Sequence, residues 1–218
     1  MTERLVKVYS VFNRVWHWSQ VASIFLLLFT GLGVMGLHSL IPFKAAVVLH
    51  TIAALALLLL WAFATFWLFT TGAWRQFIPT RTGLRAVLRF YAWGVFRGEE
   101  HPYQKRLRAR HNPLQAASYL ALKLVLFPAI WSTGIVYLLH GVWMHLDPSG
   151  QGLWLVANLH VLAGFAIAAF VVVHVYLLTI GHGFREHVRP MITGFEKVTL
   201  TPEQEAYLSA DEPGRLKG

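Results

Sequence analysis

Two histidines, His160 and His174, carry the most specific chemical signal in this chain, and they lie fourteen residues apart in one long uncharged segment. On an α-helix, which rises about 1.5 Å per residue, their positions would lie roughly 21 Å apart along the axis. Fourteen steps of about 100° leave the two side chains roughly 40° apart around that axis, so both would face one side. Because imidazole is a common metal ligand, the spacing predicts two metal centres at two depths of an apolar layer about 30 Å thick.

The segment that carries these histidines is one of four apolar stretches long enough to cross a bilayer. Hydrophobic residues make up 56% of the 218-residue chain and charged residues only 13%, whereas soluble domains carry about 25% charged residues. Each stretch exceeds the roughly 20 residues that a spanning helix needs, and none alternates as a barrel strand would. We therefore predict an all-α integral membrane four-helix bundle, with spans at about residues 14–37, 43–71, 113–140 and 151–182.

The distribution of lysine and arginine sets the orientation of this bundle. These residues cluster before the first span, between the second and third spans, and after the fourth, whereas the charged residues of the other two loops are Lys44 and Asp147. The positive-inside rule then places both termini and the long middle loop in the cytoplasm. The net charge of +9 follows from this topology, so we expect the lipid bilayer and no nucleic acid as a partner.

The long middle loop contains an apolar stripe at helical spacing. The stripe predicts an amphipathic helix on the inner leaflet, and packing on a partner subunit is the alternative. Its members are Leu84, Val87, Leu88, Tyr91, Val95 and Phe96.

Residues 1–195 are predicted to form one transmembrane domain and residues 196–218 a cytoplasmic tail of unknown order. The first apolar run is too long for a cleavable signal peptide and is expected to stay as a helix. The chain has no cysteine, which excludes disulfides, iron–sulfur clusters and covalently attached c-type haem within it. Any haem would be held by coordination and packing.

Four of the eleven histidines lie well inside the predicted spans, and the orientation sorts them into two pairs by depth. His50 in the second helix and His160 in the fourth are expected near the periplasmic side. His17 in the first helix and His174 in the fourth are expected toward the cytoplasmic side. The inner match is looser, and helix tilt could absorb the difference.

Paired imidazoles suit the two axial positions of b-type haem. With both axial positions filled there is no open site for oxygen chemistry, so electron transfer is the expected task. The spans leave room for a flat macrocycle at Gly31, Gly33, Gly134 and Gly164, and Arg14 is placed to meet the propionates of the inner haem.

Two other interpretations of the histidines remain open at this point. A lone intramembrane histidine is usually a hydrogen-bonded packing residue. A proton or cation transporter would place aspartate or glutamate in its spans, and the four predicted spans contain neither.

The motifs around these histidines resemble a known family over about residues 5–195. The chain looks like the four-helix, dihaem cytochrome b membrane subunits of formate dehydrogenase, thiosulfate reductase and nickel–iron hydrogenase, which are bacterial cytochrome b561-like proteins. The matching motifs are Asn13-Arg14-Val15-Trp16-His17-Trp18, Thr30-Gly31, His50, Asn112-Pro113-Leu114-Gln115, Thr133-Gly134, and the His160 to His174 spacing followed by Tyr176.

The resemblance implies the same haem pairing as depth does, with His17 and His174 on the inner haem and His50 and His160 on the outer one. It also implies a menaquinone or ubiquinone site near the inner haem, formed here by His111, Asn112, Gln115 and Lys123. Helix capping is the alternative role for Asn112 and Gln115, and Lys123 could instead extend to the inner membrane surface.

We therefore expect an electron-transfer subunit of a respiratory, quinone-linked oxidoreductase in the bacterial inner membrane. Electrons would pass between a periplasmic redox subunit (an iron–sulfur, multihaem or other protein), two b haems and the quinone pool. The chain alone would not act on the partner's substrate. One alternative is a stand-alone four-helix quinol oxidoreductase of the superoxide-oxidising or ferric-reducing type, and a more remote one is a cofactor-free transporter or assembly protein.

Overall fold

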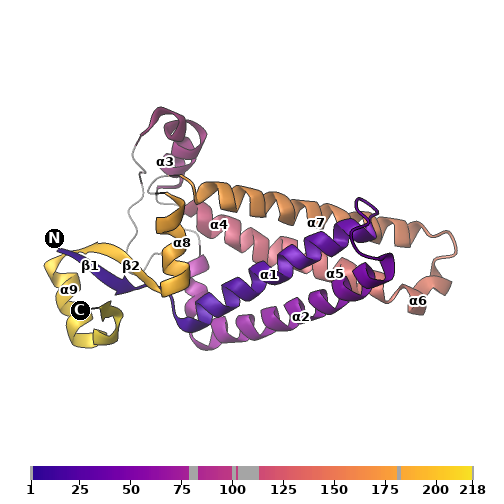
Figure 1. Ribbon diagram of the computed structural model, residues 1–218, viewed down its shortest axis with the longest axis horizontal. Helices are drawn as coiled ribbons and strands as arrows, with labels where there is room; N and C mark the ends of the chain where they lie inside the picture. Colours follow the sequence, from indigo (N-terminus) through magenta and orange to yellow (C-terminus); the bar gives the residue numbers. More distant parts are fainter. Residues whose placement is uncertain (1, 79–82, 100–101, 103–112, 181–182, 218) are drawn as a thin grey trace. The chain divides into compact units, whose positions relative to one another are not determined.

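A computed structural model describes residues 2–78, 83–99, 102, 113–180 and 183–217 (Figure 1). The chain forms two compact units. One contains both ends of the chain, through Phe25 and from Val175 onward, and the other contains Leu26–His174.

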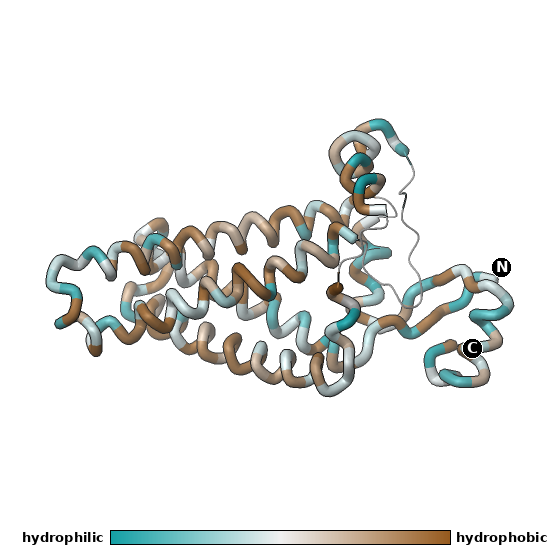
Figure 2. The backbone as a smooth tube through the Cα atoms, turned by 180° about the vertical axis from the view of Figure 1, so that it is seen from behind, coloured by the Kyte–Doolittle hydropathy of each residue, from teal (hydrophilic) through white to brown (hydrophobic). Residues whose placement is uncertain are grey.

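Within the described residues, four helical segments are long and apolar enough to cross a membrane: α1 (Val11–Val34), α2 (Phe43–Thr70), the Pro113–Leu138 segment and α7 (Gln151–Leu177). The predicted all-α membrane bundle of four helices is thus confirmed. Figure 2 shows hydrophobic residues along these helices. Leu59 and Phe66 of α2 and Val172 of α7 are exposed, an arrangement that suits contact with lipid. Which side of the membrane holds the termini stays a prediction.

Aromatic contacts hold these helices together within the second unit. The rings of Trp61 in α2 and Trp131 in the third span lie 4.4 Å apart, centre to centre. The rings of Tyr119 and Phe170 join the third span to α7 at 6.2 Å. Such edge-to-face pairs add about 0.5–1.5 kcal/mol each beyond burial of their area, so the bundle has specific contacts along its length.

Helix α1 begins at Val11, three residues before its predicted start at residue 14. The hydroxyl of Ser10 accepts a hydrogen bond of 3.1 Å from the Asn13 backbone N–H. This bond satisfies one of the free donors of the first turn, as an N-cap does. The fourth span is shorter than predicted: α7 ends at Leu177, whereas its predicted end is at about residue 182.

The third span is not a uniform α-helix. It consists of α4 (Pro113–Ala121), a π-helical turn (Leu122–Leu126) and α5 (Phe127–Leu138). Pro128 has no N–H to donate and its ring would clash with the carbonyl of Leu124 in a regular α-helix. A wider turn just before the proline relieves that clash.

Two short segments lead from the third span to α7. They are α6 (His140–Trp143) and a 3-10 turn (Met144–Leu146). The Asp147 carboxylate then accepts a bond of 3.0 Å from the Leu153 N–H in the first turn of α7. This backbone bond holds the pKa of Asp147 below its usual value, so the carboxylate stays charged at the positive end of the helix.

The helix predicted in the middle loop is present. After a 3-10 turn (Ala73–Phe77) come α3 (Leu84–Arg89), a π-helical turn (Phe90–Gly94) and a 3-10 turn (Val95–Arg97). Its buried side is made by Val87, Phe90 and Gly94.

Part of the predicted stripe lies on the exposed side of this helix. Leu88 and Phe96, which were assigned to the stripe, are exposed, and so is Trp93. The π turn shifts the angular positions of the residues after Arg89, which a regular period of 3.6 does not anticipate. The location of this helix on the inner leaflet stays a prediction.

The two ends of the chain form one small sheet in the first unit. Strand β1 (Thr2–Lys7) pairs antiparallel with β2 (Phe195–Leu200) on one side and with β3 (Leu216–Lys217) on the other. Helices α8 (Phe184–Thr193) and α9 (Pro202–Asp211) and a 3-10 turn (Pro213–Arg215) complete this region. Val6, Leu200 and Leu208 have no exposed surface. The tail of unknown order predicted for residues 196–218 is thus ordered, as far as Lys217, against the strand that precedes α1.

The turn from α8 to β2 is fixed by the residues around α1. Gly194 ends α8 with φ +88°, and its carbonyl accepts bonds from the N–H of Val8 at 2.8 Å and of Tyr9 at 3.2 Å. The Arg14 guanidinium donates to the Ile192 carbonyl, and the Trp18 indole donates to the Met191 carbonyl at 3.0 Å. Arg14 and Trp18 thereby bind carbonyl groups in the last turn of α8, its negative end.

Replacing Gly194 with alanine should loosen this turn. The left-handed backbone costs a residue with a Cβ about 1–2 kcal/mol, and that Cβ would lie 3.0 Å from the Tyr9 carbonyl oxygen. We expect faster hydrogen exchange at the Val8 amide in the Gly194→Ala protein. Gly214→Ala is the matched control, since a Cβ there meets no atom within 4 Å; equal exchange in both variants would contradict this account.

Acidification should loosen the contact between α9 and β1. The Thr2 hydroxyl and the Arg4 guanidinium each donate to the Glu205 carboxylate at 2.7 Å. Both hydrogen bonds lower the pKa of Glu205, and the bond from Thr2 contributes most. Because the pKa of this carboxyl is lower in the folded state, the contact stabilises the folded protein at pH values above the unfolded-state pKa of about 4.3. This stabilisation is lost as the pH falls through the folded-state pKa. The protection factors of the β1 amides, which compare their exchange with that of an unstructured chain at the same pH, should therefore fall below about pH 4.

The Glu205→Gln protein should lack this step in amide exchange, because no carboxylate is left to protonate. Glu203→Gln is the control, since Glu203 lies on the same helix and is exposed. A step that survives in the Glu205→Gln protein would assign the pH dependence to another group.

Candidate functional site

The structure brings together the two histidines that were predicted as the outer pair. His50 of α2 and His160 of α7 face each other with their ring centres 6.2 Å apart and their planes at 72°. Both side chains are half-buried. Two imidazoles from helices far apart in the sequence thus converge on one place in the bundle.

Each of these rings is held by its Nδ1 atom. His50 Nδ1 lies 3.0 Å from the Thr30 hydroxyl of α1. His160 Nδ1 lies 3.2 Å from the Thr133 hydroxyl of α5 and 3.1 Å from the Ile130 carbonyl oxygen. These bonds leave Nε2 of each ring as the nitrogen that can bind a metal.

The spacing of the rings suits one metal held between them. A nitrogen ligand binds a metal at roughly 2 Å, and a ring centre lies about 1 Å behind its nitrogen, so two opposed imidazoles should have centres about 6 Å apart. The observed separation is 6.2 Å. Two imidazoles supply two ligands, and a porphyrin supplies four more, so this pair fits the axial positions of haem.

The predicted inner pair is divided between the two units. His174 lies at the end of the second unit, where its ring stacks on Phe170 at 6.0 Å and meets Tyr119 edge-on at 6.4 Å. His17 lies in the first unit, where its ring meets Trp18 edge-on at 5.3 Å. The pairing of His17 with His174 stays a prediction.

Tyr119 was not among the predicted site residues. It is one helical turn after Gln115 on α4, and the spacing of four residues was the available signal. Its contact with His174 depends on how α4 packs against α7, which the sequence alone does not give.

The residues predicted for a quinone are only partly described. His111 and Asn112 lie outside the described residues. Gln115 is half-buried on α4, and the Lys123 ammonium lies 4.9 Å from the centre of the Phe77 ring. Their role with a quinone stays a prediction, as does that of Arg14 with a haem propionate.

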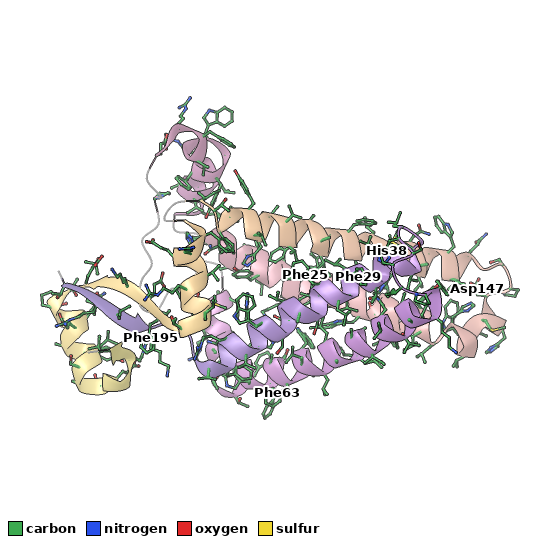
Figure 3. The ribbon with its side chains drawn as sticks, in the orientation of Figure 1. Phe25, Phe29, His38, Phe63, Asp147 and Phe195 are labelled. Carbon is green, nitrogen blue, oxygen red and sulfur yellow. The ribbon has the colours of Figure 1, made fainter. Side chains whose placement is uncertain are left out.

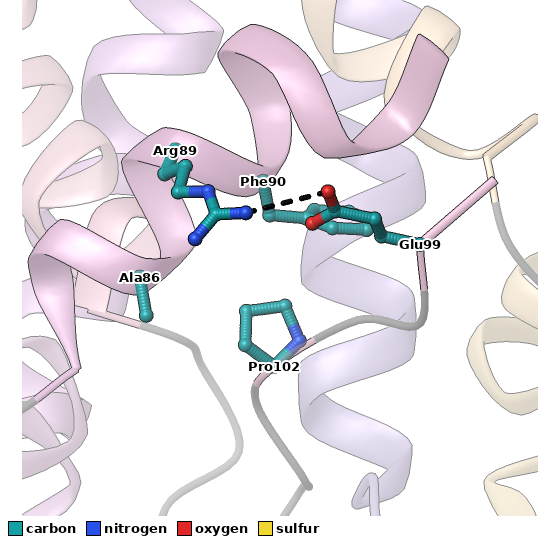
Figure 4. Close-up of a pocket in the computed structure, with 5 residues that line it drawn as sticks. All are labelled: Ala86, Arg89, Phe90, Glu99 and Pro102. Carbon is teal, nitrogen blue, oxygen red and sulfur yellow. Dashed lines mark hydrogen bonds and ion pairs between the residues drawn. The ribbon is translucent and has the colours of Figure 1, made fainter. Parts of the chain in front are cut away.

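A small pocket lies on the middle-loop helix. Figure 4 shows the ion pair between Arg89 and Glu99, 3.4 Å long, across this pocket. Among the described residues its lining consists of Ala86, Arg89, Phe90, Glu99 and Pro102.

His38 folds back on α1. Its Nε2 lies 2.8 Å from the Phe29 carbonyl oxygen and its ring stacks on Phe29 with centres 4.6 Å apart. Figure 3 labels both residues. This contact satisfies a carbonyl near the end of α1, so His38 has a structural role there.

Comparisons with known proteins identify the family of the chain. A family model described as prokaryotic cytochrome b561 matches residues 8–194. A protein of Escherichia coli (strain K12) named "Putative cytochrome YdhU" is 28% identical over 197 residues, which cover 88% of this chain and 75% of that protein. No solved structure matches the chain. The chain therefore belongs to the prokaryotic cytochrome b561 family, whose members transfer electrons through b-type haem in the membrane.

Proposed function

We propose that this multi-pass membrane cytochrome is the electron-transfer subunit of a respiratory oxidoreductase in the bacterial inner membrane. It would hold two b haems, one between His50 and His160 and one between His17 and His174. The observation that carries the proposal is the facing pair of His50 and His160, with ring centres 6.2 Å apart and each Nδ1 bound by the protein. When bound, haem supplies a reversible one-electron couple.

Helix α7 would serve both haems. It contributes His160 to the outer pair and His174 to the inner pair, and the α-helix between them is continuous. The rise of the helix places the two positions roughly 21 Å apart along its axis. The length of one rigid element would thus set the distance that an electron crosses within the protein.

The ends of this path would meet a protein and a quinone. A periplasmic redox subunit would dock at the outer side, where the two connections between spans are short. Menaquinone or ubiquinone would bind near the inner haem, beside Gln115 and Lys123. The contact of Tyr119 with His174 supports this location, because Tyr119 lies between Gln115 and Lys123 on the same helical segment.

Haem content tests the ligand assignment directly. We expect two b haems per chain in the wild type and one in each of the His17→Ala, His50→Ala, His160→Ala and His174→Ala proteins, because loss of one axial imidazole leaves iron with a single protein ligand. The measurement is the amount of extracted haem per purified protein, with the reduced-minus-oxidised spectrum.

His145→Ala is the control, because His145 is an exposed histidine of the same chain. It should keep both haems. Two haems in the His160→Ala protein would contradict the outer assignment, and the absence of any b-type spectrum in the wild type would contradict the proposal as a whole.

The subunit role has its own test. Purification under mild conditions from native membranes should yield a periplasmic redox protein bound to this chain. A stand-alone quinol oxidoreductase would instead be isolated alone and would pass electrons from quinol to a soluble acceptor without a partner.

A further inference from the structure

We infer that Thr30 and Thr133 are positioning residues for the outer haem. Thr30 fixes the tautomer and the rotation of the His50 imidazole, and Thr133 fixes the rotation of the His160 imidazole, whose tautomer is set together with the Ile130 carbonyl. The inference rests on the proposed haem ligation by His50 and His160. Thr30 lies on α1 and Thr133 lies on α5, so neither threonine is on the helix that carries its histidine.

The hydrogen bonds of Thr30 determine which nitrogen of His50 carries the proton. A hydroxyl has one hydrogen to donate, and that of Thr30 points to the Leu26 carbonyl oxygen at 2.7 Å. The Thr30 oxygen must then accept from His50 Nδ1, which lies 3.0 Å away. Nδ1 is therefore protonated, and Nε2 keeps the lone pair that binds a metal.

The same accounting applies to Thr133 and His160. The Thr133 hydroxyl donates to the Ala129 carbonyl oxygen at 2.6 Å and lies 3.2 Å from His160 Nδ1. His160 Nδ1 also lies 3.1 Å from the Ile130 carbonyl oxygen. A carbonyl can only accept, so His160 Nδ1 must be the donor and Nε2 must again be the free ligand.

The residue after each threonine is a glycine that lets the imidazole approach. A Cβ added at Gly31 would lie 3.3 Å from His50 Cε1, and one added at Gly134 would lie 3.0 Å from His160 Cε1. Each Thr-Gly pair thus binds one edge of a ring through the hydroxyl and leaves space for the adjacent carbon. Together they restrict how each ring can turn about its axis.

This arrangement occurs twice in the bundle. Thr30-Gly31 of α1 holds the imidazole of α2, and Thr133-Gly134 of α5 holds the imidazole of α7. The result is a pair of rings with planes 72° apart. The angle between axial imidazole planes affects the magnetic anisotropy of ferric haem, so the two modules should determine a measurable spectroscopic property.

The threonines should also tune the ligand strength of the imidazoles. A hydrogen bond from Nδ1 makes Nε2 a stronger base, and loss of such an outer partner typically lowers metal affinity about 10- to 100-fold. The stronger base favours the ferric state over the ferrous state. Removing the bond should therefore raise the midpoint potential, by about 59 mV for a tenfold loss of affinity confined to ferric haem.

The test uses Thr30→Val and Thr133→Val in the full chain, each purified with its haems. Valine keeps the shape of threonine and removes the hydroxyl. The outer-haem signal is the one lost in the His50→Ala protein. We expect each valine variant to change the electron paramagnetic resonance anisotropy of that haem. Thr30→Val should also raise its midpoint potential and retain it about tenfold less tightly. Thr133→Val should change the potential and the retention less, because the Ile130 carbonyl still accepts from His160 Nδ1.

Rescue and control variants separate positioning from general stability. Thr30→Ser and Thr133→Ser restore a hydroxyl and should restore the wild-type spectrum and potential. Thr51→Val and Ser132→Ala remove hydroxyls that also donate to a carbonyl of their own helix, to Val47 and Ala129 respectively, and should leave the outer haem unchanged.

Two results would overturn the inference, and they are distinguishable. If the wild type holds two b haems but both valine variants keep its spectrum and potential, the positioning role is wrong and the proposed function stands. If the wild type holds no b haem, the proposed function and this inference both fail.

Discussion

An imidazole inside a bilayer has no water to accept its N–H, so a protein group must do so. At His50 and His160 a threonine hydroxyl on a neighbouring helix meets that requirement. Each hydroxyl donates its own hydrogen to a backbone carbonyl of its helix and accepts from the imidazole. The bond restricts the ring and leaves Nε2 as its other nitrogen. The packing of α1 against α2 and of α5 against α7 therefore positions the two rings, in addition to stabilising the bundle.

Helix α7 is the element on which the proposed electron path depends. Its polar start is fixed by Asp147, and its interior is apolar apart from the two histidines and Asn158, whose amide donates to the Trp154 carbonyl at 2.7 Å. A continuous helix keeps the step between its histidines constant even where the bundle shifts. The third span can bend at its π turn without changing that step, because it carries neither histidine.

The sequence was sufficient for the spans and for bringing His50 near His160, because length, hydropathy and charge in a bilayer leave few alternatives. It did not reveal the function of the Thr-Gly pairs, since a threonine in an apolar helix has the same local signal whether or not an imidazole faces it. The missed sheet has a different cause: β1 and β2 are short and lie at opposite ends of the chain. The capping box of Thr201 and Gln204 was readable and would have located α9.

The sheet at the chain ends also has a consequence for biogenesis. Strand β1 is made first, and its partner β2 follows α7, so the pairing waits until all four spans have been synthesised. It can form only when the two ends emerge on one side of the bilayer, which requires an even number of crossings. A chain that failed to insert one span would leave β1 with an unpaired edge, a surface prone to association and open to proteases. The strand β1 is therefore protected from association and proteolysis only when all the spans have inserted correctly and β2 can pair with it.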